Sequence, residues 1–127
     1  MNPQRVAVIV AVAALLSLAG CGSDGVDDLA PVPLAEDAAG ATVYEERCAS
    51  CHGTDLRGTD KGPSQLSIVY EPGHHGDDAY VSAIRNGAQQ HHWGFGDMPA
   101  IEGITDGQIQ RVITYIRDEQ RRRGFEQ

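Results

Sequence analysis

Cysteine is scarce in this chain of 127 residues, which contains three. A framework of several disulfides is therefore excluded by count. The pair Cys48 and Cys51 is also too small a set for a zinc ribbon, which uses two such pairs, or one pair together with two spaced histidines. The function of these two thiols must come from chemistry that needs only one closely spaced pair.

The apolar run near the N-terminus is too short to span a bilayer comfortably. It covers Val6–Leu18, 13 residues, and follows Arg5, whereas a spanning helix needs about 20. Its flanks are typical of a secretory signal, with a buried helix or a short anchor as the alternative. The residues Leu18-Ala19-Gly20-Cys21 resemble a bacterial lipobox. The resemblance implies that residues 1–20 are a lipoprotein signal peptide and that lipidated Cys21 anchors the protein, outside the cytoplasm, to a bacterial membrane.

Basic residues are absent from the next segment, residues 22–39, which is rich in glycine, proline and acids and carries five carboxylates. Such a segment cannot bury enough apolar surface to become ordered, so we expect residues 21–39 to be an acidic flexible tether. Residues 40–127 remain as one small domain. At this size a hydrophobic core alone is marginal, and a cofactor or a metal is expected to support it.

The net charge makes nucleic acid a poor candidate partner. The whole chain has 18 acidic and 10 basic residues, and residues 40–127 have 13 and 9 of them. An acidic protein repels the phosphate backbone. Acidic carriers instead approach partners that have a basic docking surface, at a rate that falls as salt rises.

The stretch Cys48-Ala49-Ser50-Cys51-His52 places two thiols three positions apart and an imidazole directly after the second. This is the attachment signature of c-type haem, in which the thiols add to the vinyl groups and the histidine binds the iron. A thioredoxin-like site also has the C-x-x-C spacing, but on a strand-to-helix turn, and no strand-rich run precedes Cys48. A redox disulfide between Cys48 and Cys51 remains the alternative.

Met98 is the only methionine besides Met1, and it lies in a loop between glycine and proline, Gly96-Asp97-Met98-Pro99. A lone methionine ordinarily fills a core, but this one is not on an apolar helical stripe. We therefore expect its thioether to be the second axial ligand of the iron, which raises the reduction potential relative to a second imidazole.

Two histidine doublets, His74-His75 and His91-His92, supply four further imidazoles. Any of them could in principle replace Met98, although paired histidines in glycine-rich loops are more often solvated. A metal site made from His91 and His92 is disfavoured because adjacent positions rarely point the same way. The same loop holds Trp93 and Phe95, which we expect to cover a face or an edge of the haem.

Three helices are predicted in the domain. The first places Gly40, Tyr44 and Cys48 on one face, at spacings of four. The second covers about residues 77–86, with two acids at its start and Gly87 as its stop. The third begins near residue 106, after a capping box of Thr105 and Gln108. Its apolar residues recur with helical period: Ile109, Val112, Ile113 and Ile116.

These motifs together resemble those of class I, monohaem bacterial cytochromes c, over residues 40–121. They occur in the family's order: Cys48-x-x-Cys51-His52-Gly53, Gly62-Pro63-x-x-Leu66, Ile84-Arg85-Asn86-Gly87, Met98-Pro99-Ala100 and a final amphipathic helix. The resemblance implies an all-α fold of three to five helices around one covalently attached haem, with the first and last helices crossing. Gly40 and Tyr44 would then pack across Val112 and Tyr115.

The resemblance also assigns roles to residues. It implies that His52 is the proximal ligand, Met98 the distal one, and the carbonyl of Pro63 the acceptor for the free ring nitrogen of His52. The expected function is a membrane-tethered single-electron carrier, not an enzyme in its own right. It would serve redox partners of a respiratory or dehydrogenase chain, either freely or as a subunit of an oxidoreductase complex.

Two other classes of function stay open. One is a haem-based gas-binding or peroxidase-like protein with a labile sixth ligand, with His91 or His92 as the distal hydrogen-bond donor. The other is a thiol-disulfide lipoprotein that uses Cys48 and Cys51, whose signature would be the absence of covalent haem.

Overall fold

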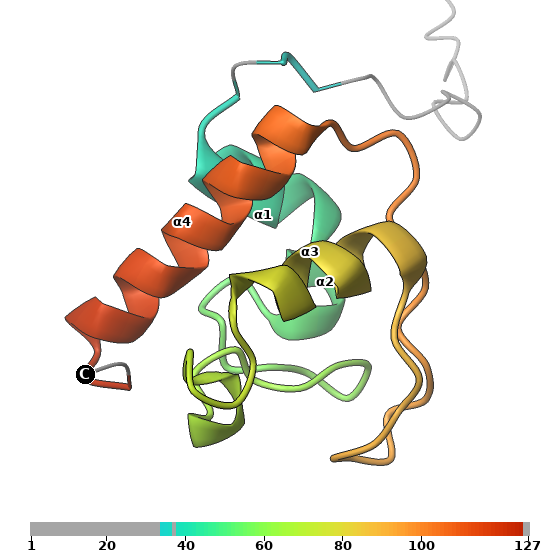
Figure 1. The fold of residues 1–127 in the computed structure, drawn as a ribbon, viewed down its shortest axis with the longest axis vertical. Helices are drawn as coiled ribbons and strands as arrows, with labels where there is room; N and C mark the ends of the chain where they lie inside the picture. The colour runs from blue at the N-terminus through green and yellow to red at the C-terminus, as the bar shows by residue number, and fades with distance from the viewer. Residues whose placement is uncertain (1–33, 37, 126–127) are drawn as a thin grey trace, which may run out of the picture. The chain divides into compact units, whose positions relative to one another are not determined.

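The computed structural model describes residues 34–36 and 38–125. Within them the order of elements is α1 (Gly40–Arg47), α2 (Ala49–His52), the 3-10 helix η1 (Ile68–Tyr70), α3 (Asp77–Asn86) and α4 (Asp106–Arg122). The only strand-like pairing of the described residues is an isolated bridge between Ala88 and Met98. The expectation of an all-α fold with three to five α-helices is confirmed (Figure 1).

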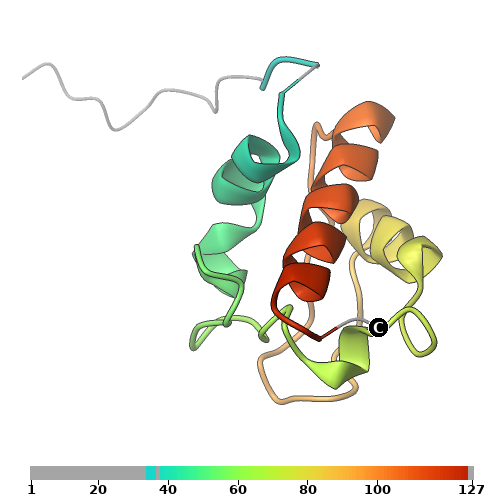
Figure 2. The ribbon, with the colours of Figure 1, turned by 90° about the vertical axis from the view of Figure 1, so that its left-hand side faces the viewer.

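The longest helix, α4, begins where the sequence predicted. The Thr105 hydroxyl accepts a hydrogen bond from the Gln108 amide, and the Gln108 side chain accepts one from the Thr105 amide, which completes a capping box. Its apolar face is buried over the predicted residues, Ile109, Val112, Ile113 and Ile116. Because α4 lies between α1 and α3 (Figure 2), this single face supplies core side chains to both.

The first and last helices cross at Gly40, as expected. A Cβ atom at this position would lie 2.1 Å from the carbonyl oxygen of Arg111 and 2.9 Å from Cβ of Tyr115. A side chain there would push the helices apart, so glycine is what permits the close crossing. One turn further along α1, the ring of Tyr44 packs on that of Tyr115, with centroids 5.5 Å apart.

Helix α3 has the bounds that its sequence predicted, residues 77–86. Asp77 and Asp78 occupy its first turn, where negative charge complements the helix dipole. The helix ends at Gly87, whose φ of 75° is in the left-handed region that glycine tolerates. Its buried residues, Tyr80 and Ile84, face the core.

Part of the segment before α1 contacts the domain. The Gln108 side chain donates to the carbonyl oxygens of Leu34 and Ala35, and Arg111 donates to that of Ala38. These contacts attach the described residues before Gly40 to the start of α4. The predicted signal peptide, Cys21 and most of the predicted tether lie outside the described residues. None of the helices in the described part of the chain is long and apolar enough to cross a membrane.

Candidate functional site

The residues of the predicted haem-attachment motif form one helical turn. Cys48 precedes α2 as its N-cap, and its carbonyl oxygen accepts hydrogen bonds from the amides of Cys51 (3.1 Å) and His52 (3.0 Å). No disulfide joins Cys48 to Cys51. The single turn brings the two thiols to the same helix, with the imidazole directly after the second.

The backbone after His52 is fixed by glycines. Gly53 ends α2 with a φ of 79°, and Gly58 has a φ of 82°. The amide of Gly58 then donates to the carbonyl oxygen of His52, at 2.8 Å. A Cβ at Gly58 would lie 2.7 Å from the amide nitrogen of Ser64. After α2 the chain therefore folds back in a tight loop, and this loop places Pro63 beside His52.

The imidazole of His52 is held in one tautomer. Its Nδ1 lies 2.8 Å from the carbonyl oxygen of Pro63, the contact that the resemblance led us to expect. A carbonyl oxygen only accepts, so the ring proton belongs on Nδ1, and Nε2 keeps the lone pair that a metal needs. Burial lowers the pKa of His52, against an opposing effect of the Pro63 hydrogen bond. The ring is thus neutral at physiological pH, the form that binds iron.

Gln65 is a neighbour of His52 that sequence analysis did not identify. Its oxygen accepts from the Tyr80 hydroxyl at 2.9 Å, while its side-chain nitrogen lies 2.9 Å from Nδ1 of His52 without a hydrogen bond, because both nitrogens carry protons. Tyr80 in turn receives a hydrogen bond from the buried amide of Gln120. This buried polar network links the loop after the motif to α3 and α4. No periodicity or motif in the sequence indicates this network, because its members are far apart in the chain.

Met98 is positioned by the end of α3. Ala88 and Met98 exchange two backbone hydrogen bonds, of 2.9 and 2.8 Å. The approach is close because a Cβ at Gly87 would lie 2.6 Å from the carbonyl oxygen of Met98. The loop between these partners, residues 87–98, is consequently closed at its base.

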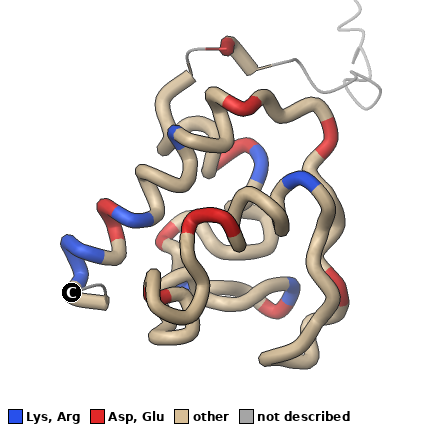
Figure 3. The backbone as a smooth tube through the Cα atoms, viewed as in Figure 1, with Lys and Arg blue, Asp and Glu red and all other residues tan. Residues whose placement is uncertain are grey.

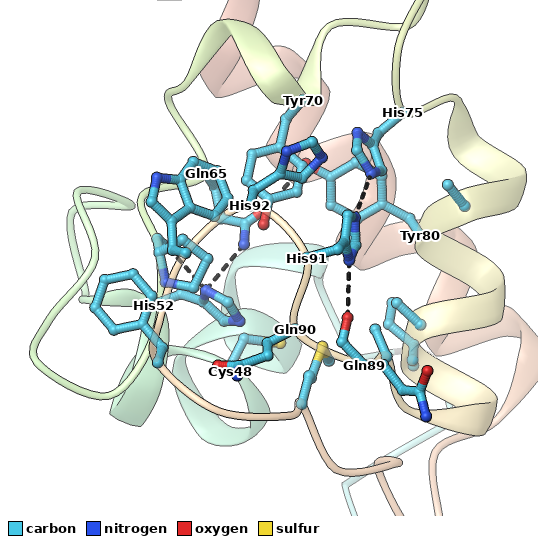
Figure 4. A pocket seen from close by; sticks show the side chains of 18 of the residues that line it. Cys48, His52, Gln65, Tyr70, His75, Tyr80, Gln89, Gln90, His91 and His92 are labelled. Carbon is cyan, nitrogen blue, oxygen red and sulfur yellow. Dashed lines mark hydrogen bonds between the residues drawn. The ribbon is translucent and has the colours of Figure 1, made fainter.

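Both candidate axial ligands line one pocket (Figure 4). Its walls are mainly aromatic and aliphatic and include Tyr44, Ile84 and Trp93, with Cys48 also at the surface. The pocket encloses about 910 Å³ when the open solvent at its mouth is counted. Trp93 and Phe95 line it too, as expected for residues that cover a haem. Free thiols, a neutral imidazole and an apolar cavity are the set that covalent haem requires.

The electrostatics of Cys48 do not suit thiol-disulfide exchange. Burial raises the pKa of this thiol to about 12, with a further contribution from Cys51. The thiolate is the nucleophile in exchange, and redox cysteines accordingly have lowered pKa values. Cys48 is thus protonated at neutral pH and is a poor nucleophile for that reaction.

The four histidines of the two doublets come together, which the sequence did not predict. Three of the rings, His75, His91 and His92, line the pocket. The ring centroids of His91 and His92 lie 4.3 Å apart, so these adjacent side chains do point the same way. The pKa of His92 is lowered, mainly by partial desolvation and to a smaller extent by the neighbouring imidazoles.

Comparison with known protein families identifies the family to which this chain belongs. The family model described as Cytochrome c matches residues 38–120. The chain belongs to the cytochrome c family. Haem c is accordingly attached through Cys48 and Cys51, whose spacing is that of the C-x-x-C-H motif. Among curated proteins, no match to this cytochrome is found.

The family membership also gives the class of function. Cytochromes c are electron-transfer proteins, and the haem supplies them with a one-electron ferrous/ferric couple. The chain is a class I cytochrome with an all-α fold, and α1, α3 and the 87–98 loop all contribute residues to the pocket that would hold its haem.

Proposed function

We propose that the protein is a membrane-tethered carrier of single electrons whose haem iron is held axially by His52 and Met98. The observation that supports this most strongly is that both side chains line the same pocket, although they come from separate parts of the chain. His52 presents the tautomer that leaves Nε2 available for iron, because Pro63 holds the proton on Nδ1.

The residues around the pocket suit electron transfer because they limit movement. The Pro63 carbonyl fixes the ring plane of His52, and the bridge to Ala88 fixes the backbone of Met98. The walls of the space between them are mainly apolar. A site that changes little between its two charge states needs little reorganisation when an electron arrives or leaves.

An absorption spectrum of the purified protein, oxidised and then reduced, tests the ligand assignment. We expect covalent haem c and, in the ferric form, the weak long-wavelength band of a sulfur-to-iron bond. Met98→Leu keeps the apolar volume but removes the sulfur, so the band should vanish. The reduction potential should fall by at least about a tenth of a volt, since axial ligands and surroundings together span about 0.8 V.

Other spectra would contradict the proposal in specific ways. Covalent haem without the sulfur band in the unmodified protein would mean that a histidine or an open position replaces Met98, which favours the gas-binding or peroxidase-like alternative. Absence of haem from cells competent to attach it would favour the thiol-disulfide alternative at Cys48 and Cys51.

Attachment to the membrane is a second part of the proposal, and it rests on the lipobox-like residues that end at Cys21. This residue lies outside the described residues. Cys21→Ser removes the thiol to which lipid would be joined, so the haem-containing protein should move from the membrane fraction to the soluble fraction. Equal membrane association of both proteins would rule out a lipid anchor at this position.

The expected partners are redox proteins with a basic docking surface. Basic residues gather at the C-terminal end of α4 (Figure 3), but most of their charge is offset locally, since Arg121 pairs with Asp118 and Arg122 and Arg123 share Glu119. In the domain as a whole, acidic residues outnumber basic residues, and this excess of negative charge dominates the long-range electrostatic field. The rate of reduction by a basic donor should fall as salt rises, and a rate that rises with salt would contradict an acidic docking face.

A further inference from the structure

Two loops bring four imidazoles into one cluster at the mouth of the pocket. His74 and His75 stand in the turn before α3, and His91 and His92 in the 87–98 loop (Figure 4 labels three of the four). Nε2 of His74 lies 3.4 Å from Nε2 of His92, and Nε2 of His75 lies 3.4 Å from Nε2 of His91. The sequence separations are too large for these contacts to result from local geometry.

The spacing of the nitrogens suits a metal ion. In a tetrahedral zinc site with bonds of about 2.0–2.1 Å, two ligand nitrogens lie about 3.4 Å apart. Candidate ligand atoms of His74, His75 and His92 all lie within 4.8 Å of one another. Nitrogens at 3.4 Å are, by contrast, too distant for a good hydrogen bond between two imidazoles.

The tautomers of His75 and His91 each leave a lone pair on Nε2, and these two lone pairs point toward each other. Nδ1 of His75 lies 2.7 Å from the carbonyl oxygen of Val69, and Nδ1 of His91 lies 2.8 Å from that of Gln89. Both carbonyls only accept, so both Nδ1 atoms carry the proton. The two Nε2 lone pairs therefore face each other across 3.4 Å. A cation bound to Nε2 of His75 relieves this repulsion, and the carbonyl contacts are those that orient metal-binding histidines.

The backbone of the turn that carries His74 and His75 is held by the side chain of Arg117. Arg117 is 4% exposed and donates hydrogen bonds to the carbonyl oxygens of Tyr70 (2.5 Å) and His75 (2.7 Å), and it pairs with Asp77 at 2.8 Å. Its guanidinium also lies over the ring of Tyr80, 4.9 Å from the centroid. Three contacts to one buried side chain fix both ends of the turn, so the backbone that carries two of the imidazoles is in place before any ion arrives.

We propose that His74, His75 and His92, with His91 beside His75, form a binding site for one divalent transition-metal ion. Ligands that are all imidazole favour zinc, copper or nickel over magnesium or calcium. His74 and His92 are exposed, so an ion can enter from solvent. Since His75, His91 and His92 also line the haem pocket, the ion would fasten the 87–98 loop over it. This site is separate from the axial ligands and does not depend on their assignment.

Calorimetric titration of Zn²⁺ into the haem-loaded, chelator-treated protein tests the site. Zinc has no redox chemistry, so it leaves the oxidation state of the haem unchanged. We expect one ion per protein with micromolar or tighter affinity. His74→Ala and His92→Ala should each weaken binding at least about tenfold, since even changes outside the ligand set cost that much. The double variant should abolish binding. Glu102→Gln, which removes an exposed carboxylate outside the cluster, should bind as the unmodified protein does.

Three results would overturn the proposal. One is the absence of zinc binding to the unmodified protein. Another is stoichiometric binding that survives in the double variant, which would place the ion elsewhere, for example on carboxylates. The third is a change of haem ligation in His92→Ala, seen in the absorption spectrum, because it would assign this histidine to the iron. A missing sulfur-to-iron band in the metal-free unmodified protein concerns Met98 alone and leaves the zinc result to be judged separately.

Discussion

The two sides of the haem pocket are built in opposite ways. Around His52, residues 48–66 return on themselves through glycines with positive φ, and the backbone bonds directly to the ligand ring through Pro63. Around Met98, residues 87–98 have one backbone bridge at the base, two side-chain hydrogen bonds join Gln90 to residues 96 and 97, and the stretch 89–97 is exposed. The comparison teaches that one candidate ligand is fixed by a backbone carbonyl bonded to its ring, and the other by a single bridge of its own backbone.

The tight return of residues 48–66 should be the most sensitive place for an added methyl group. Gly58→Ala forces an alanine to a φ of 82° and places Cβ 2.7 Å from the nitrogen of Ser64. We expect a loss of about 2–4 kcal/mol in the free energy of unfolding, from backbone strain and overpacking together. Denaturant unfolding of the haem-loaded protein measures it.

Gly94→Ala is the matched control in the other segment, since a Cβ there meets nothing within 4 Å. Its unfolding free energy should change by no more than about 0.5 kcal/mol. Equal losses in the two variants would mean that the two sides do not differ in the way described.

The base of the 87–98 loop should respond next most strongly. In Gly87→Ala the new Cβ would lie 2.6 Å from the carbonyl oxygen of Met98, at a φ of 75°. We expect a loss of about 1–3 kcal/mol and a weakened sulfur-to-iron band. Gly96→Ala has a similar φ, 92°, with open space around the new atom. It should retain the band, and loss of the band in both variants would show that strain anywhere in the loop displaces Met98.

The hydroxyl of Tyr44 is a smaller support on the side of His52. It donates to the carbonyl oxygen of Gly53 at 2.9 Å and lies 3.3 Å from that of His52. Tyr44→Phe should cost about 1–2 kcal/mol, because a buried acceptor loses its donor. Tyr115→Phe is the control, since its hydroxyl takes part in none of the described hydrogen bonds. A similar loss in the control would assign the effect to the ring pair and not to the carbonyl contact.

The same tyrosine gives a pH dependence of defined sign. Burial raises the pKa of Tyr44 in the folded protein, with a smaller contribution from Cys48. An unfolded tyrosine ionises near pH 10, so the stabilisation is complete below that pH and is lost as the pH rises above it. The fall in unfolding free energy between about pH 9 and 11 should be shallower in Tyr44→Phe than in the unmodified protein. An unchanged slope would mean that Tyr44 does not contribute to it.

The smallest effect on stability is expected from the exposed part of the 87–98 loop. Trp93 is 36% exposed and stacks on Tyr70, with centroids 5.9 Å apart. Trp93→Ala should cost under about 1 kcal/mol. It should nevertheless lower the reduction potential, because water gains access to the pocket. Phe125→Ala is the control, as an exposed aromatic that does not line the pocket. An equal shift of potential in both variants would contradict a covering role for Trp93.

Much of the fold could be predicted because its signals are local. The bounds of α3 and the capping box before α4 each depend on residues that lie close together or follow a helical period, whereas the glycine at the helix crossing meets residues far away in the sequence and was expected from the resemblance to a family. The hydrogen bond between His52 and Pro63 was expected from the resemblance alone, and no local signal in the sequence indicates it. The resemblance to a family then gave these local features a common arrangement.

What could not be predicted depends on tertiary contacts between polar side chains. Arg117 follows the last residue of the apolar stripe of α4 and would be assigned to solvent by its charge, yet the turn at residues 70–77 covers it. The histidine doublets likewise have no sequence signal that pairs one with the other. Their meeting is decided by where two loops end in space, and only coordinates reveal this.

The crossing of α1 and α4 has a consequence for the order in which the domain is completed during its synthesis. The residues that bear the thiols follow α1 at once, whereas the helix that packs on α1 is made last. Until α4 is available, Val43 and Tyr44 lack the surface that buries them, and the domain cannot close. The polypeptide therefore passes through a stage in which α1 and the thiols that follow it are already made, while the core side chains of α1 are not yet covered.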